Sequence, residues 1–298
     1  MKKILLSAAV ATLAASSAFS ASPKRLASIT ETENSSSYVT TFTYDSEGRL
    51  SSIIDSSSTI EIDYSNLAKG KITITNSSKY SSEKSTYEVT VNDLGFATSA
   101  TETDSDGDTN SWEFSYSDGK LMKITAIDGP DKEYTDITWE DDLITTYVET
   151  ESYDSDISSA TFAYSGVANT GKLALFDEIY GFDIDDLEYL AQEGYFGVIP
   201  RELPTGITFK DEDGTQSSTV NWELDADGYP VKISSPQERN ESTSFAWEAD
   251  NTGVESVAAD INGASKFFTI DGRQVQNPSG GLFIERRADG SSIKRIIK

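Results

Sequence analysis

Apolar and polar residues alternate along short segments through most of the chain. In one such segment, Trp112, Phe114 and Tyr116 alternate with polar residues, Asp118-Gly119 follows, and a second apolar segment comes next. Alternation with a period of two is typical of a strand with one buried face, and an Asp-Gly turn between two strands predicts a hairpin. The segment therefore predicts a β-hairpin that buries its aromatic side chains.

The same pattern recurs on both sides of this hairpin. Turn residues return about every 12 residues between Gly95 and Gly166, which is the spacing of short antiparallel strands. Thr, Ser and Glu separate the alternating apolar residues, so one face of the sheet packs and the other meets water. We predict an all-β fold, a long antiparallel meander that either stays open or closes into a barrel. The alternating sets are Phe42/Tyr44, Ile60/Ile62/Tyr64, Ile72/Ile74, Tyr87/Val89/Val91, Ile137/Trp139 and Phe162/Tyr164.

The pattern changes to helical spacing near Leu173. Ile184, Leu187 and Leu190 form one apolar stripe, Asp183 is suited to a helix N-cap, and Gly194 to a C-cap. We predict one amphipathic helical insertion at residues 173–196. Because such a stripe needs an apolar partner, the insertion is expected to plug or cap the sheet.

An internal repeat spans the insertion. Asp213-Gly214, Trp222 and Asp227-Gly228 repeat the order of Asp106-Gly107, Trp112 and Asp118-Gly119. The repeat favours one continuous sheet interrupted by the insertion over two unrelated domains.

The two ends of the chain differ from the meander, which we place at residues 38–259. Residues 1–20 have the basic start, apolar run and small-residue site of a secretory signal peptide, and 21–37 are expected to be a flexible segment. The tail, 260–298, has an inverted charge balance: from Lys266 onward, seven basic residues face three acidic ones. It predicts a small β module, with a sorting signal as one interpretation.

The signal peptide predicts an exported protein, extracellular or on the cell surface, with the periplasm as the alternative. After it, no apolar run reaches the length of a membrane-spanning helix. The chain carries 50 acidic and 24 basic residues, a net charge of −26. Such a surface repels nucleic acid, so we expect no nucleic-acid partner.

The chain contains no Cys and no His. This excludes thiolate nucleophiles, Ser-His-Asp catalysis and the usual ligands of zinc and copper. The classes of function that remain are catalysis by carboxylates, catalysis by a Ser-Lys pair, or no catalysis.

Three acidic segments are candidate sites. Residues 102–113 carry carboxylates with the spacing of a calcium loop, from Glu102 through Asp104 and Asp106 to Glu113. The segment also falls on an expected hairpin turn, where Asp and Gly are common because they favour turns. The groups 140–142 and 183–186 are the densest carboxylate clusters. A glycosidase needs two carboxylates that face each other across a cleft, and sequence neighbours do not establish that. We therefore assign no catalytic, cofactor-binding or metal-binding residue.

Three stretches resemble known families. The segment from Gln192 to Gly197 through Glu202-Leu203-Pro204, after a helix in a meander, resembles exported Bacteroidota proteins with a domain of unknown function described as porin-like. Tyr44 to Leu50 resembles the tyrosine-aspartate repeats of larger surface proteins. Residues 270–275 with 280–284 resemble the tails of secreted proteins of that phylum, some of which are type IX sorting signals. The resemblance implies export and a porin-like meander, and it brings no catalytic residues.

We therefore expect a non-enzymatic surface or secreted protein that binds a ligand or has a structural role, without a cofactor. A glycan or another envelope protein are the candidate partners. The alternative is a glycan-binding module or a carboxylate-dependent glycosidase. Exposed coplanar aromatic rings would favour glycan binding, and a cleft with two facing carboxylates would favour hydrolysis.

Overall fold

A computed structural model describes residues 24–34, 36–153, 157–182, 184–237 and 241–249, and the strand residues 266–269, 274–275, 281–286 and 292–297. The predicted signal peptide, Asp183 and the boundary at residue 260 lie outside the described residues. The described chain divides into two compact units, one ending at Asp250 and the other holding Asn251–Lys298.

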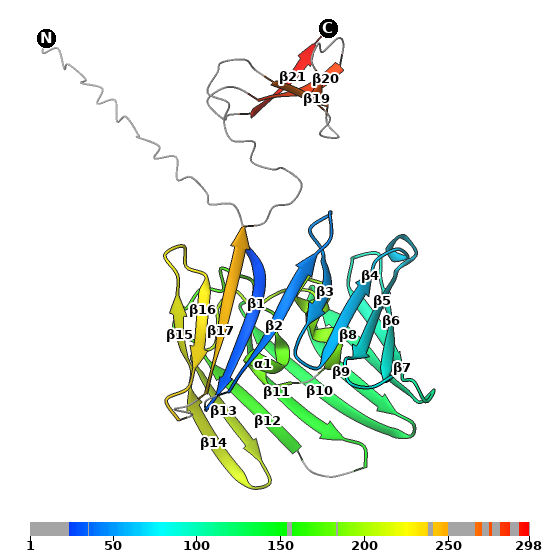
Figure 1. The fold of residues 1–298 in the computed structure, drawn as a ribbon. Coiled ribbons are helices and arrows are strands. Elements are labelled where there is room, and N and C mark those ends of the chain that lie inside the picture. The colour runs from blue at the N-terminus through cyan, green and yellow to red at the C-terminus, as the bar shows by residue number, and fades with distance from the viewer. Residues whose placement is uncertain are drawn as a thin grey trace, which may run out of the picture. The chain divides into compact units, whose positions relative to one another are not determined.

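The larger unit is a single antiparallel sheet of 17 strands, which confirms the predicted all-β meander (Figure 1). The strands are β1 (Lys24–Glu33), β2 (Ser36–Tyr44), β3 (Leu50–Ile54), β4 (Ser58–Asp63), β5 (Lys71–Ser78), β6 (Lys84–Val91), β7 (Ala97–Thr103), β8 (Thr109–Ser117), β9 (Lys120–Asp128), β10 (Asp131–Glu140), β11 (Leu143–Glu151), β12 (Ile157–Ala163), β13 (Gly206–Asp211), β14 (Gly214–Thr219), β15 (Asn221–Leu224), β16 (Pro230–Ser234) and β17 (Glu241–Ala249).

The sheet curls into a nearly closed barrel. Each strand pairs with its sequence neighbour in most of the meander, and β17 returns to pair with β1 from Lys24↔Ala249 to Glu33↔Glu241. Because β1 and β17 pair with each other, neither of these terminal strands is an edge of the sheet.

The inward face of the barrel is apolar, as the alternation predicts. Ile72 and Ile74 on β5 and Trp112 and Phe114 on β8 are buried, whereas Glu113 between the last two is exposed. The prediction of a flexible segment at 21–37 is wrong, because β1 and the first residues of β2 lie within it. A bulge between Leu26 and Ser28 breaks the period of two on β1, so both Leu26 and Ile29 face inward and the alternation is hidden.

The predicted insertion lies between β12 and β13. It contains α1 (Phe176–Tyr180), the 3-10 helix η2 (Asp185–Leu187) and α2 (Glu188–Gln192), which follows η2 directly. Ile184, Leu187 and Leu190 are buried, which confirms the predicted stripe. In Figure 1, α1 lies inside the ring of strands. The insertion therefore plugs the barrel.

One hydrogen bond recurs around the barrel and defines its repeat. An aromatic side chain at or just after the end of one strand donates to a backbone carbonyl near the start of the preceding strand, 2.5–2.9 Å away. Trp222 of β15 makes the equivalent bond to Pro204, just before β13, at 2.7 Å. The donor–acceptor pairs are Tyr44–Leu26, Tyr64–Leu50, Tyr116–Ala97, Trp139–Leu121, Tyr164–Ile144, Trp222–Pro204 and Trp247–Pro230. The structural repeat is thus a hairpin, and it extends the internal repeat found in the sequence.

The smaller unit contains a four-stranded antiparallel sheet. Its strands are β18 (Lys266–Thr269), β19 (Gln274–Val275), β20 (Gly281–Arg286) and β21 (Ser292–Ile297), in the order β19-β18-β20-β21. The residues 270–273 and 276–280 of the tail motif lie outside the described residues.

Candidate functional site

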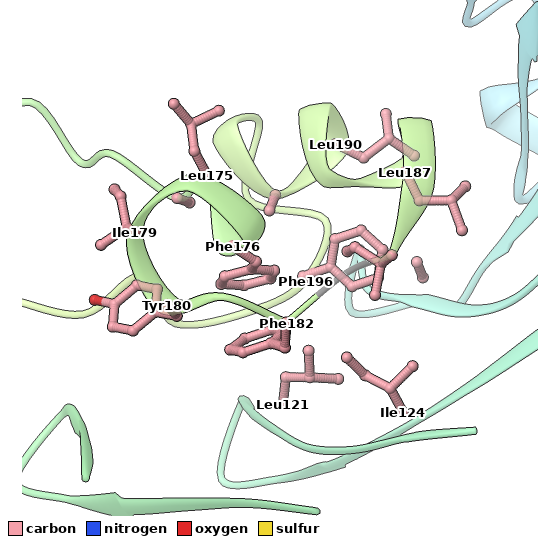
Figure 2. Close-up of a cluster of buried hydrophobic side chains, with 14 of the residues drawn as sticks. Leu121, Ile124, Leu175, Phe176, Ile179, Tyr180, Phe182, Leu187, Leu190 and Phe196 are labelled. Atoms are coloured by element: carbon pink, nitrogen blue, oxygen red, sulfur yellow. The ribbon is translucent and has the colours of Figure 1, made fainter. Parts of the chain in front are cut away.

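The interior of the barrel is occupied by side chains. Figure 2 shows Phe176, Phe182 and Phe196 of the insertion packed with Leu121 and Ile124 of β9. The rings of Phe176 and Phe182 lie 4.8 Å apart, and Phe196 meets Phe114 of β8 edge to face, also at 4.8 Å. A binding site must therefore be sought at the ends of the barrel or in its wall.

Backbone hydrogen bonds fasten this plug to the sheet. Ala97 N of β7 donates to Tyr195 O, and Val198 N donates to Gly119 O, both at 2.8 Å. Gly197 has a φ of 87°, and a Cβ atom there would lie 2.2 Å from Gly119 O. Glycine is required at 197 because the insertion and the β8–β9 turn touch through their backbones.

The wall of the barrel is interrupted between β14 and β15, two consecutive strands that do not share a partner. β14 pairs with β13 from Gly206↔Thr219 to Asp211↔Gly214, whereas β15, one residue later, pairs with β16 from Asn221↔Ser234. Val220 is the residue between them. Among the described residues, β14 has no ladder partner on its side opposite β13.

A pocket of about 370 Å³, called the wall pocket below, lies at this interruption. Ile207, Phe209, Val220 and Ile233 provide its apolar lining. The polar lining consists of Glu178, Gln216, Ser218, Ser234, Ser235, Glu241, Ser242 and Thr243. The pocket thus combines apolar surface, hydroxyl groups and carboxyl groups, a mixture suited to an organic ligand.

Glu178 of α1 is the carboxyl group that reaches the pocket from the plug. Burial is the main reason that its pKa is raised to about 7. A hydrogen bond with the Thr243 side chain lowers this pKa, and the charges of Glu31 and Asp177 contribute to the rise. A second pocket of about 360 Å³ shares Glu178, Glu241, Ser242 and Thr243 with the first and adds Glu31, Glu33 and Tyr38. Glu178 is therefore reached from both pockets.

The structure separates the carboxylates of the calcium-like segment 102–113. Glu102 pairs with Tyr87 and shares its inward face, whereas Glu113 lies between buried Trp112 and Phe114 and points outward. Asp104 Oδ1 accepts hydrogen bonds from Asp106 N and Asp108 N, both at 2.9 Å, and so closes the turn. The described residues contain no cluster of three or more potential ligands placed to hold a metal ion.

The other two acidic groups are also dispersed. Asp141 and Asp142 form the β10–β11 turn at positive φ, and Asp142 pairs with Lys120 at 2.8 Å. Asp186 accepts a hydrogen bond from Asn76 Nδ2 at 2.8 Å, and burial raises its pKa. Asp183 lies outside the described residues. Neither group lines the wall pocket.

The aromatic residues are mostly used by the fold. Trp112 is buried, and Trp139, Trp222 and Trp247 pack against the core and donate to strand carbonyls. The four Trp side chains therefore serve the core and the hydrogen bonds of the fold. The exposed tyrosines Tyr38, Tyr80 and Tyr153 are not among the ring pairs found in the described part of the chain.

Sequence reasoning did not identify Glu178. It stands among apolar residues of the insertion, but nothing in the local pattern distinguishes it from the other acidic residues there. The pocket becomes visible only when α1, β13, β14, β16 and β17 are brought together by the fold.

Taken together, the fold defines a class of protein: a nearly closed antiparallel barrel with an apolar interior and an internal plug. Residues 42–232 match the family described as a domain of unknown function (DUF4595) with porin-like fold. The chain belongs to this family, which confirms that part of the resemblance found in the sequence.

Solved structures show the same fold. A porin-like protein from Bacteroides uniformis superposes with a TM-score of 0.56 at 17% identity, over 76% of this chain and 99% of that one. A porin-like protein from Bacteroides vulgatus has a TM-score of 0.55 at 12% identity, over the same shares of the two chains. None of the curated proteins matches the sequence. At these identities the similarity establishes the fold alone.

Proposed function

We propose that the protein is an exported, non-enzymatic binding or structural protein that acts on the cell surface or as a secreted protein. The observation that carries this proposal is the plug. Because the insertion fills the barrel with Phe176, Phe182 and other core side chains, the interior offers a ligand little access. Contact with a partner is left to the outer face, the turns and the wall pocket.

The polarity of the sheet supports an outer face in contact with water. Exposed Glu61, Glu88 and Glu113 lie on this face, between buried apolar neighbours. A sheet that crosses a membrane has the reverse alternation, with its apolar residues outward. Within the described residues, no helix has the length and apolar character needed to cross a membrane. The signal-peptide pattern at residues 1–20 supports export.

A carboxylate-dependent glycosidase is the second candidate, and one observation favours it. Glu178 has a pKa raised to about 7, as a general acid near neutral pH requires, and Glu31 and Glu241 lie on the adjoining pocket. A glycan-binding module would use the same pocket without turnover. Phe209 lines the first pocket and Tyr38 the second, but neither belongs to a ring pair in the described part of the chain. The lack of paired, coplanar rings weighs against both candidates.

The test is a glycan array run beside a panel of polysaccharide hydrolysis assays, with wild type and Glu178→Gln. Binding of a partner without turnover supports the proposal. Turnover that Glu178→Gln abolishes would establish the glycosidase instead. Glu61→Gln on the outer face is the matched control, because it removes one carboxylate away from the pocket.

A further inference from the structure

At the interruption in the barrel wall, none of the described residues forms a ladder with the edge of β14 that faces away from β13. Asp211 and Gly214 flank the two-residue turn of the β13–β14 hairpin, so they form a hydrogen-bonded pair. The backbone groups of Gln216 and Ser218 then point toward β13 as well. Val220 N donates to Thr205 O at 3.0 Å, which fits the same alternation.

The backbone groups of Thr215, Ser217 and Thr219 consequently point away from β13. No described residue pairs with them in a ladder. A strand edge that presents such donors and acceptors is a template for another extended segment, which gains main-chain hydrogen bonds by adding itself to the sheet.

The wall pocket lies beside this edge and on the inner side of it. Gln216 and Ser218 line the pocket with their side chains, whereas Ser217 faces outward, where its hydroxyl lies 3.0 Å from that of Thr208. A segment added along β14 would therefore direct every second side chain into the pocket. The pocket lining includes Glu178 and Glu241, and none of the described lining residues is Lys or Arg.

We propose that β14 and the wall pocket together bind an extended peptide segment, which adds as a strand and places a Lys side chain in the pocket toward Glu178. The aliphatic part of the Lys would lie on Ile207 and Val220, and its ammonium would meet a carboxylate that lacks a basic partner in the described lining. This rests on the proposed binding function and names the partner as a protein with an exposed, extended, basic segment.

The site favours a peptide over a glycan for a physical reason. The edge supplies a row of backbone donors and acceptors at strand spacing, which a peptide matches and a sugar ring does not. Phe209 is the one aromatic side chain among the described residues that line the pocket, so a stacking platform for sugars is not formed there.

The experiment measures binding of a labelled, end-capped peptide of about eight residues, in which Thr and Val alternate around one central Lys. Fluorescence anisotropy is recorded with the full chain and with Ser217→Pro, Ser217→Ala and Glu178→Gln. Proline at 217 removes an N–H that points away from β13, so it blocks the added strand and leaves the β13–β14 ladder intact. Ser217→Ala removes the same hydroxyl but keeps the N–H.

We expect Ser217→Pro to abolish binding and Ser217→Ala to bind like wild type. Glu178→Gln should weaken the Lys peptide by about tenfold or more, as for loss of a charge-assisted hydrogen bond. A peptide whose backbone nitrogens are methylated along one edge should not bind the wild-type protein, because it cannot donate the hydrogen bonds of an added strand. This measurement needs no protein variant, so it tests the inference even if Ser217→Pro does not fold. Equal binding of the methylated peptide, or no binding of the Lys peptide at all, would overturn the inference.

Hydrolysis assays on the same preparations separate the two proposals. Turnover of a polysaccharide would overturn the proposed non-enzymatic function. Absence of both turnover and peptide binding would overturn the peptide site and leave the non-enzymatic function standing.

Discussion

The phenol of Tyr116 donates a hydrogen bond to the backbone carbonyl of Ala97 at 2.7 Å, across the open ends of strands β7 and β8. Phe96, the residue before Ala97, stacks on the same ring at 5.2 Å. Arg49 and Lys120 occupy the equivalent position beside Tyr64 and Trp139. In these three hairpins the repeat combines an aromatic donor, a backbone carbonyl and a side chain that covers the ring.

Removal of this hydroxyl should destabilise the protein. Tyr116→Phe leaves the Ala97 carbonyl without its donor in a half-buried site, which costs about 1 kcal/mol for a lost hydrogen bond. Urea unfolding followed by circular dichroism measures the change. Tyr80→Phe is the control, because Tyr80 is 82% exposed and water can replace its hydrogen bond to Ser56 O. An equal effect of both substitutions would contradict a structural role for the repeat.

The contact between the plug and the β8–β9 turn should not accept a side chain. We expect Gly197→Ala to destabilise the fold by about 2–4 kcal/mol, the sum of a left-handed backbone penalty and overpacking against Gly119. Gly194→Ala is the matched control, since Gly194 has a φ of 83° but open space where its Cβ would be. Chemical denaturation of the two variants should separate them, and similar losses would argue against close contact at 197.

The buried side chains of the plug should contribute to the stability of the fold as core residues do. Leu187 is fully buried, so Leu187→Ala should lower the free energy of unfolding by about 2–5 kcal/mol. Leu94→Ala, at a residue that is 78% exposed, should change it little. A loss below about half a kcal/mol for Leu187→Ala would mean that the plug leaves the barrel readily.

Acidification should stabilise the protein over the pH range between the pKa values of Glu178 in the unfolded and folded states. Its pKa is near 4.5 in the unfolded chain and about 7 in the fold, so the folded state binds the proton more tightly. Stability therefore falls as the pH rises from about 4.5 to 7, and it recovers on acidification. We expect a higher melting temperature at pH 5 than at pH 8, and a smaller difference in Glu178→Gln than in Glu61→Gln. Equal slopes would show that Glu178 titrates as an exposed carboxyl.

Calcium should have no specific effect. Because Glu102 and Glu113 lie on opposite faces of the sheet, the segment 102–113 does not assemble a ligand set. Millimolar calcium and magnesium should therefore shift the melting temperature alike, and Glu113→Gln should not alter the response. A saturable shift with calcium alone that is lost in Glu113→Gln would contradict this.

Much of the fold could be predicted from the sequence because the strands bury one face. Trp112, Phe114 and Ile72 follow the period of two and are inward, and the stripe Ile184, Leu187 and Leu190 is buried as expected. β1 was not predicted, because the bulge near Leu26 removes the period from its sequence. Barrel closure was left open, since pairing of β17 with β1 joins residues more than 200 positions apart.

The candidate site could not be predicted for the same reason. Glu178, Gln216 and Thr243 come from separate parts of the chain, and only the change of partner between β14 and β15 brings them around one pocket. Sequence clusters instead pointed to residues 102–113 and 140–142, where Asp and Gly serve the turns. The tail motif and the signal-peptide pattern stay predictions.

The central proposal is that this barrel binds a partner without catalysing a reaction, and one measurement tests it most directly. Release of reducing ends from a panel of polysaccharides should be followed near pH 6, where Glu178 is largely protonated in the fold and could act as an acid. The account predicts no turnover above buffer for the wild-type protein. Turnover by the wild type that disappears in Glu178→Gln and persists in Glu61→Gln would contradict it.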